Sequence, residues 1–183
     1  MTTVRVATVS DATAIAEIYA PAVRDSFISF EADPPAPDEM ARRIDQTLQT
    51  HPWLVAEHEG EVTGYAYASK HRERAAYRWA VDVAVYIRGD RHRTGIGRAL
   101  YERLIEILRM QGFHTAFAGI ALPNPASIRL HEAFGFKLIG TYKEVGFKGG
   151  QWLDVGWWEL ILSDAGLSPD EPKPFASIRD RYP

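Results

Sequence analysis

The segment VYIRGDRHRTGIGR, residues 85–98, most constrains how this chain can fold, because an apolar strand leads through a basic, glycine-bearing turn into a long helix. Gly95 and Gly97 let the main chain approach a ligand without a Cβ in the way. Successive backbone N–H groups in such a turn can face one point, and the helix start adds about half a positive charge. The segment therefore predicts a diphosphate site, to which Arg93 and Arg98 add charge.

Two known phosphate motifs do not fit this segment. The Lys-Ser/Thr pair of the Walker A motif is absent, and the dinucleotide fingerprint fails because Leu100 stands where its third glycine belongs. The turn also lies in the middle of the chain and not in a first βαβ unit. A second interpretation is that Gly95 and Gly97 only cap the helix and that the arginines are solvated; the turn taken alone favours it.

Hydrophobic periodicity along the chain predicts a mixed α/β fold with the order β-α-α-β-β-β-α-β-α-β-β. A length of 183 residues suits one domain, which we place at residues 1–162, followed by a surface tail at 163–183. Pro21 is expected to kink or interrupt the first helix. The expected strands are 4–9, 53–57, 62–69, 78–87, 113–120, 136–145 and 152–162, and the expected helices follow Ser10-Asp11 and cover 38–50, 96–110 and 124–134.

Composition excludes several classes of protein. The 21 basic and 24 acidic residues give a formal net charge of -3, which argues against a nucleic-acid surface. The chain has no cysteine, so it forms no disulfide, thiolate nucleophile or Cys-ligated zinc site, and this fits a reducing cytoplasm. The N-terminus lacks the pattern of a signal peptide, and no apolar run approaches the roughly 20 residues that cross a bilayer. We therefore expect a cytoplasmic protein that binds neither nucleic acid nor membrane.

A second motif, NPASIRLHEAFGF at residues 124–136, changes the interpretation of the turn. The turn resembles the Gln/Arg-x-x-Gly-x-Gly/Ala motif of GNAT acetyltransferases, with His92 at the Gln/Arg position, and residues 124–136 resemble the second conserved helix of that superfamily with its terminal Gly-Phe. The resemblance extends from Val4 to Leu162. It implies the GNAT fold, a mixed and mostly antiparallel central sheet flanked by helices, with acetyl-CoA as cosubstrate and no metal.

Three further segments narrow the family. PWLVAE at 52–57, GFK at 146–148 and WLDVG at 152–156 resemble phosphinothricin N-acetyltransferases, and residues 71–83 look most like the related arsinothricin acetyltransferases. This resemblance implies a homodimer that acetylates the α-amino group of glutamate-analogue toxins (arsinothricin, phosphinothricin and methionine sulfoximine) by direct transfer and so confers resistance. Alternatives are an acetyltransferase for protein N-termini or ordinary amino acids, and a CoA-binding regulator without turnover.

Asp82 is the main catalytic candidate because it lies among apolar residues of a strand, where Asp is depleted. A carboxylate so placed should have a raised pKa and could take the ammonium proton through one or two waters. Phosphinothricin enzymes usually carry Glu here, and Asp falls roughly 1.5 Å shorter, so we expect a bridging water. The alternative is a structural acceptor for Tyr77 or a neighbouring arginine.

The second motif supplies further candidates by resemblance. His131 stands where many superfamily members have a tyrosine that protonates the departing thiolate, and it becomes a candidate general acid; a packed or solvated histidine is the alternative. Asn124 and Ser127 are expected to contact pantetheine, or alternatively only to cap a helix. With the turn and the preceding strand, the expected cofactor-binding residues are Val85, Tyr86, Ile87, His92, Arg93, Thr94, Gly95, Ile96, Gly97, Arg98, Asn124 and Ser127.

A basic cluster precedes the strand of Asp82 and suggests how an anionic acceptor is held; its members are Lys70, His71, Arg72, Arg74 and Arg78. Such runs are usually solvated, but an α-carboxylate and a distal oxyanion need two cations, and Arg72 and Arg74 are the expected clamps. Phe30 and Tyr77 are expected to form an apolar wall. By resemblance to the dimeric family, Lys148 or Trp152 closes the site from a partner subunit.

Overall fold

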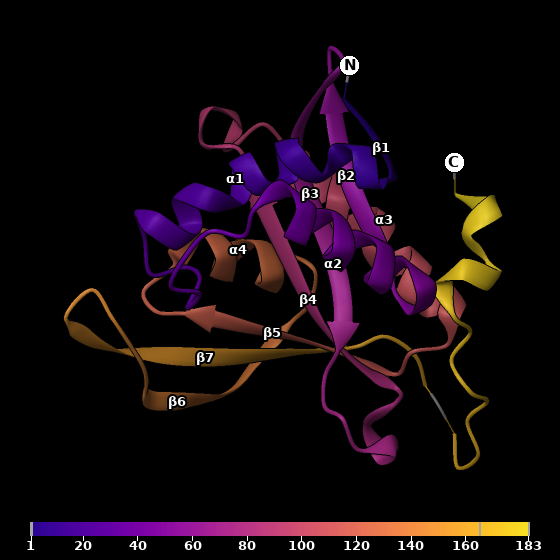
Figure 1. Cartoon of the computed structure of the whole chain (residues 1–183). Coiled ribbons are helices and arrows are strands. Elements are labelled where there is room, and N and C mark those ends of the chain that lie inside the picture. Colours follow the sequence, from indigo (N-terminus) through magenta and orange to yellow (C-terminus); the bar gives the residue numbers. More distant parts are fainter. Residues whose placement is uncertain (1, 165, 183) are drawn as a thin grey trace.

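A seven-stranded sheet forms the centre of the protein, for which a computed structural model describes residues 2–164 and 166–182. The strand order is β1-β2-β3-β4-β5-β7-β6 (Figure 1), and every neighbouring pair is antiparallel except β4 and β5. The predicted mixed, mostly antiparallel sheet is therefore confirmed. The strands are β1 (Thr2–Val6), β2 (Trp53–His58), β3 (Glu61–Lys70), β4 (Ala80–Ile87), β5 (Thr115–Ala121), β6 (Lys137–Lys148) and β7 (Gln151–Ile161).

The parallel pair of strands separates soon after it begins. Pairing between β4 and β5 covers three positions and ends at Asp82 and Phe117, although β4 continues to Ile87 and β5 to Ala121. Beyond this point β4 stays with β3 while β5 follows β7 (Figure 1). The edge of β4 that faces β5 is therefore open after Asp82.

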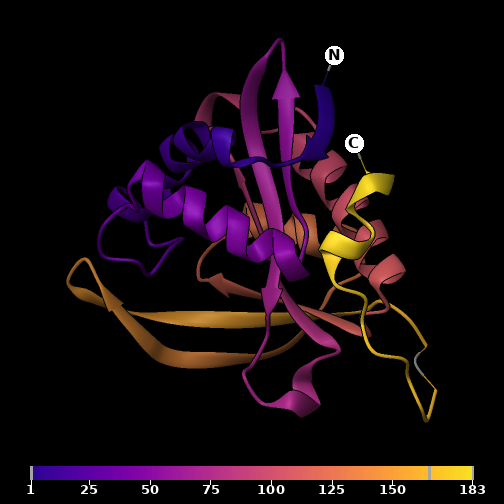
Figure 2. The same cartoon turned by 45° about the vertical axis from the view of Figure 1, so that its right-hand side comes forward.

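Helices cover both faces of the sheet. α1 and α2 lie against one face and α3 and α4 against the other (Figures 1 and 2). The apolar stripes found in the sequence are the buried ones: Met40, Ile44 and Leu48 of α2, for example, are each at most 5% exposed. The bounds are α1 (Ala12–Arg24), α2 (Pro37–Thr50), α3 (Ile96–Gln111) and α4 (Pro125–Ala133).

Two expectations about local structure are wrong. α1 is not interrupted at Pro21 but continues to Arg24, because the proline falls in the last turn, where its ring removes a single amide. The strand expected from residue 78 begins at Ala80, since Ala75–Tyr77 forms a 3-10 turn whose carbonyl at Ala75 accepts from the amide of Arg78.

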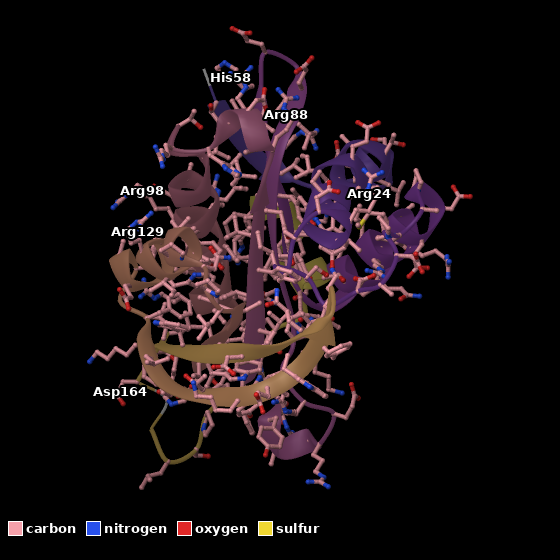
Figure 3. The ribbon with its side chains drawn as sticks, turned by 90° about the vertical axis from the view of Figure 1, so that its left-hand side faces the viewer. Arg24, His58, Arg88, Arg98, Arg129 and Asp164 are labelled. Atoms are coloured by element: carbon pink, nitrogen blue, oxygen red, sulfur yellow. The ribbon has the colours of Figure 1, made fainter. Side chains whose placement is uncertain are left out.

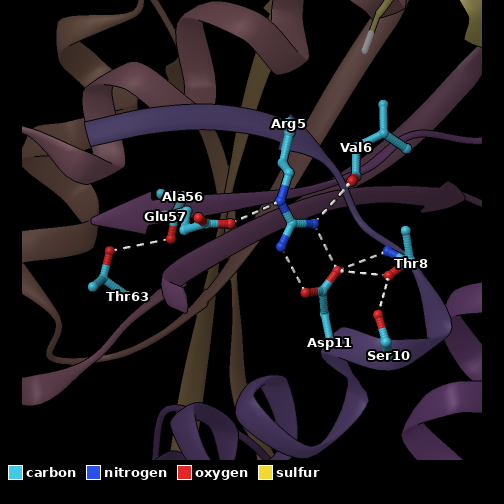
Figure 4. Close-up of polar contacts among 8 residues, drawn as sticks. All are labelled: Arg5, Val6, Thr8, Ser10, Asp11, Ala56, Glu57 and Thr63. Atoms are coloured by element: carbon cyan, nitrogen blue, oxygen red, sulfur yellow. Dashed lines mark hydrogen bonds and ion pairs between the residues drawn. The ribbon is translucent and has the colours of Figure 1, made fainter. Parts of the chain in front are cut away.

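An ion-pair network fixes the N-terminal strand (Figure 4). The guanidinium of Arg5 donates two hydrogen bonds of 2.8 Å to the carboxylate of Asp11 and one of 3.0 Å to Glu57 on β2. Burial alone would raise the pKa of Asp11, but the bonds from Arg5 and from the Thr8 amide bring that pKa below its ordinary value. Strand β1, the short turn after it and β2 are thus held together by one guanidinium.

The segment after β7 returns to the core. Phe175 is fully buried, and Ile178 and Tyr182 are nearly so, within the hydrophobic cluster between helices and sheet. Gln111 at the end of α3 donates to the carbonyl of Lys173, whose amide donates to the Gln111 carbonyl. The buried side chains of Phe175, Ile178 and Tyr182 therefore attach this segment, which was expected to form a surface tail, to the rest of the protein. Over the residues that the structure describes, no helix has the length and apolar character needed to span a membrane.

Candidate active site

The turn between β4 and α3 presents unpaired backbone amides. Arg93 and Gly95 have left-handed backbones, with φ of 64° and 86°, and the first bond into α3 runs from the Ala99 amide to the Gly95 carbonyl. For the amides of residues 92–98, the structure records no acceptor within the described part of the chain. The amides of residues 95–98 are the open N–H groups of a helix start and suit an anion, and those of residues 92–94 precede them in the turn.

The side chains of this turn have separate roles. A Cβ at Gly97 would lie 3.3 Å from Leu130 of α4, so this glycine serves helix packing more than ligand approach, whereas Gly95 faces open space. His92 donates from Nε2 to the carbonyl of Ile87 at 3.1 Å. Arg98 pairs with Glu102 and, like Arg129 of α4, points outward on the same side of the molecule (Figure 3).

Main-chain groups of Val85, Tyr86 and Ile87 lie on the open part of β4, beyond its last pair with β5. The ring of Tyr86 is turned toward α1 and packs against Tyr19 and Tyr65 at centroid distances of 4.9 and 5.3 Å. The strand therefore offers backbone donors and acceptors along an edge that leads directly into the turn of free amides.

Asp82 stands at the point where the strands separate, and its partner is a histidine. Nδ1 of His71 donates to Oδ1 of Asp82 at 2.6 Å. Burial raises the pKa of Asp82 above its ordinary value, and the hydrogen bond from His71 offsets part of that increase. The direction of this pKa agrees with the prediction, and the recorded donor to the carboxylate is His71 in place of Tyr77 or an arginine.

Aromatic rings enclose His71. Its imidazole stacks on Phe117 of β5 at 4.4 Å and 22°, and Trp157 of β7 and Tyr77 stand edge-on to it, each at 6.0 Å. Trp157 in turn has the guanidinium of Arg72 above its ring at 5.6 Å. These contacts fix the imidazole between the two diverging strands.

Sequence reasoning did not give His71 a role, since it grouped the residue with the basic cluster. The register of the β3–β4 hairpin would have located it: Ser69 is directly opposite Asp82, and the chain reaches His71 two residues later. An acid in an apolar strand needs a partner, and a histidine just past the opposing strand is well placed to supply one.

His131 has the environment of a packed histidine. It is 3% exposed, Nδ1 donates to the carbonyl of Ser127 at 2.7 Å, and Nε2 accepts from the hydroxyl of Tyr101 at 2.8 Å. Burial lowers its pKa. Both ring nitrogens are engaged inside the protein, which favours the packed alternative over a role as general acid.

Asn124 caps α4, as one of the two interpretations predicted. Its side-chain oxygen accepts from the Ser127 amide at 3.1 Å, and the Ser127 hydroxyl lies 3.3 Å from Nδ1 of His131. A capping role leaves the amide nitrogen of Asn124 free, so contact with pantetheine stays a prediction for both residues.

The basic cluster divides into two groups. Arg72 and Arg74 are both exposed, but Arg72 lies beside the Asp82–His71 pair. Lys70 pairs with Glu73 and Arg78 with Glu171, and both line a cavity of about 700 Å³ between α2, the end of β3 and residues 171–174. Of the predicted clamps, the structure therefore records Arg72 near the acid.

The remaining predicted substrate contacts lie in different places. Tyr77 borders His71, whereas Phe30 packs on β6, where a Cβ at Gly146 would be 2.1 Å from its ring. The ammonium of Lys148 donates to carbonyls of its own chain, those of Val23 and Ser29, each at 2.6 Å. The ammonium of Lys148 is thus engaged within its own chain, and its contact with a partner's site stays a prediction.

Trp152 is 61% exposed and lies on Phe147 at 5.2 Å. It is therefore free to meet another surface. In the described residues, no group of three or more His, Asp or Glu side chains is arranged to hold a metal ion.

Known proteins share both the sequence and the fold. The family model described as an acetyltransferase (GNAT) domain matches residues 4–157. A phosphinothricin N-acetyltransferase of Streptomyces viridochromogenes is 40% identical over 175 residues, which cover 96% of this chain and 93% of its own. An L-methionine sulfoximine/L-methionine sulfone acetyltransferase of Salmonella typhimurium is 37% identical, with 92% and 98% covered.

A solved structure agrees with this grouping. The GNAT superfamily phosphinothricin acetyltransferase of Sinorhizobium meliloti, in complex with AcCoA, has a TM-score of 0.87 and 37% identity, over 94% of this chain and 93% of that one. Together with the split sheet and the turn of free amides, these likenesses show that the chain belongs to the GNAT family of acetyltransferases.

Proposed function

We propose that this protein transfers an acetyl group from acetyl-CoA to the α-amino group of glutamate-analogue toxins, and so inactivates them. One observation carries the proposal: the open edge of β4 leads from Asp82 directly into the seven unpaired amides of residues 92–98. Relatives named for phosphinothricin and for methionine sulfoximine support the class of acceptor.

The residues present fit acetyl-CoA. The amides of 92–98 would hold its diphosphate, and main-chain groups of Val85 to Ile87 would pair with its pantetheine amides. When bound, acetyl-CoA supplies an activated acetyl thioester. A backbone N–H on the open edge of β4 would polarise its carbonyl.

The acceptor amine must lose a proton before it can attack. Asp82, with His71 hydrogen-bonded to it, lies where the strands separate, so this pair suits removal of the ammonium proton. The positive charge of Arg72, close to this acid, suits a carboxylate or oxyanion of the acceptor. Because the chain has no cysteine, it cannot form an acetyl-cysteine, which favours direct transfer.

The acceptor includes arsinothricin in this proposal, since residues 71–83 resemble arsinothricin acetyltransferases. Acetylation removes the ammonium charge by which such a toxin mimics glutamate. The absence of cysteine fits a reducing cytoplasm as the place of the reaction.

We also propose a homodimer that forms through β6 and β7. β6 is an edge strand, and edge strands with apolar side chains tend to pair or to be covered. The exposed large apolar residues of these two strands are Leu138, Ile139, Tyr142, Val145, Phe147, Trp152 and Ile161. Sedimentation of the purified protein would give twice the chain mass of 20.6 kDa.

The test of the activity follows thiol release from acetyl-CoA with a panel of amines: arsinothricin, phosphinothricin, methionine sulfoximine, ordinary amino acids and short peptides. We expect release with one or more of the glutamate analogues. Release with peptides alone would indicate a protein acetyltransferase, and binding of CoA without release for any amine would indicate a regulator.

A further inference from the structure

We propose that His71, and not Asp82 itself, receives the ammonium proton of the acceptor, with Asp82 orienting and balancing the imidazole. This inference rests on the proposed function, because it assigns a further catalytic residue to the same reaction. It starts from the contact between the two side chains, Nδ1 to Oδ1 at 2.6 Å.

The hydrogen bond determines which ring nitrogen is free. When Nδ1 carries the proton donated to Asp82, Nε2 of the neutral imidazole keeps its lone pair. Among the described residues, the structure records no hydrogen-bond partner for Nε2, and the His71 side chain is 12% exposed. This nitrogen is therefore open to water or to an acceptor amine.

The position of His71 compensates for the short acid. The ring stacks on Phe117, the last residue of β5 that pairs with β4, so it lies at the point where the open edge begins. An imidazole added to Asp82 carries the basic atom several bond lengths beyond the carboxylate. The bridging water expected from sequence is then replaced by a side chain held by Phe117 and Trp157.

The proton transfer balances without another reactant. An N–H bond of the acceptor ammonium breaks, its proton moves to Nε2, and the resulting imidazolium faces the Asp82 carboxylate. The free amine forms the C–N bond as the thioester C–S bond breaks, and it loses its second proton while the thiolate gains one. The imidazolium returns its proton to solvent after the product leaves.

Charged and titratable groups lie around His71 on the elements that pack against it. Among the described residues, the charged or titratable ones are Asp82 of β4, Arg72 next to it in the chain, and Tyr77 of the 3-10 turn. β5 and β7 contribute the uncharged rings of Phe117 and Trp157, and Glu159 of β7 is directly opposite Phe117 in the sheet register.

The experiment compares His71→Asn with wild type across pH, using the best acceptor from the amine panel. Asparagine can still donate to Asp82 but cannot take a proton. We expect kcat to fall about 100-fold or more at pH 7, with the loss shrinking at high pH, where the amine deprotonates without help. Calorimetry with CoA should give an affinity within about twofold of wild type, which shows that the variant is folded.

The control is His58→Asn, at the opposite end of the β2–β3 hairpin, where a histidine also lies near a carboxylate. It should keep the wild-type profile. NMR of the ring nitrogens in the free protein adds a readout without turnover: Asp82→Asn should change the ring-nitrogen chemical shifts of His71, because Nδ1 loses its carboxylate acceptor.

Three results would overturn the inference alone while the wild type remains active: an unchanged kcat in His71→Asn, a loss that is equal at every pH, or ring-nitrogen chemical shifts of His71 that stay the same in Asp82→Asn. If the wild type acetylates no amine of the panel, the proposed function fails, and this inference fails with it.

Discussion

The ammonium of Lys148 on β6 donates to the carbonyl oxygen of Ser29 at 2.6 Å, which ties an edge strand to the loop before α2. The same group reaches the carbonyl of Val23 at the end of α1. Lys148→Met removes both bonds and should lower the free energy of unfolding by about 1.5 to 3 kcal/mol. Because Phe30 follows Ser29, KM for the acceptor should also rise several-fold.

Lys143→Met is the matched control, since Lys143 lies on the same strand and makes an exposed pair with Asp154. It should change stability by less than about 1 kcal/mol and leave KM as it is. Thermal unfolding and initial rates measure both effects. Equal behaviour of the two variants would contradict the tie between β6 and the loop.

Two glycines at opposite ends of α3 allow the anion site to be tested separately from backbone strain. Gly95 and Gly112 have φ of 86° and 89°, and neither has an atom within 4 Å of a built Cβ. Alanine at either position should therefore cost about 1 to 2 kcal/mol of stability. Only Gly95→Ala should also weaken CoA binding, by roughly tenfold, because its Cβ enters the space over the free amides. Calorimetry measures the CoA affinity of both variants. Equal affinities would contradict the assignment of the turn as the diphosphate site.

Arg72→Ala should raise KM for the acceptor by roughly tenfold or more with a smaller change in kcat, because a charge-assisted bond to the bound anion is lost. Arg74→Ala should raise KM less, since the charge that acts on Asp82 is that of Arg72. Steady-state kinetics with one acceptor compares the two. An unchanged KM in Arg72→Ala would rule out the clamp.

Asp11→Asn tests the network of the N-terminal strand through pH. The folded pKa of Asp11 lies below its ordinary 3.8, so its contribution is complete above that value and is lost as pH falls through the folded pKa. At pH 7 the free energy of unfolding of the variant should be about 1.5 to 3 kcal/mol lower than that of the wild type. This difference should shrink as the pH falls through the folded pKa of Asp11.

Chemical unfolding at several pH values provides that comparison. Asp45→Asn, at an exposed position of α2, is the control and should follow the wild type. A difference between Asp11→Asn and wild type that stays constant down to pH 2 would show that Arg5 does not stabilise the ionised acid.

The order of strands and helices could be predicted because apolar alternation and helical spacing are local properties. Strand ends were less accurate where a short turn intervenes, as at Ala75–Tyr77. The separation of β4 from β5 after Asp82 has no local signature, since it depends on which neighbour each strand follows. The burial of Phe175 was missed for a related reason: one aromatic residue among prolines shows no periodicity.

The site was predicted in part. Asp82 was recognisable because an acid is out of place in an apolar strand, and its raised pKa follows from burial. The role of Gly97 was not, because its neighbour Leu130 belongs to another helix. His71 shows the same limit, since its contact with Asp82 depends on hairpin register and on the ring of Phe117.

The fully buried ring of Phe175 has a consequence for folding. A chain that has formed only the elements up to β7 still lacks part of the apolar filling of the core, so its interior stays open. The core is therefore completed only when the segment after β7 docks, and a chain cut between Ile161 and Phe175 would present a partly open interior to chaperones and proteases.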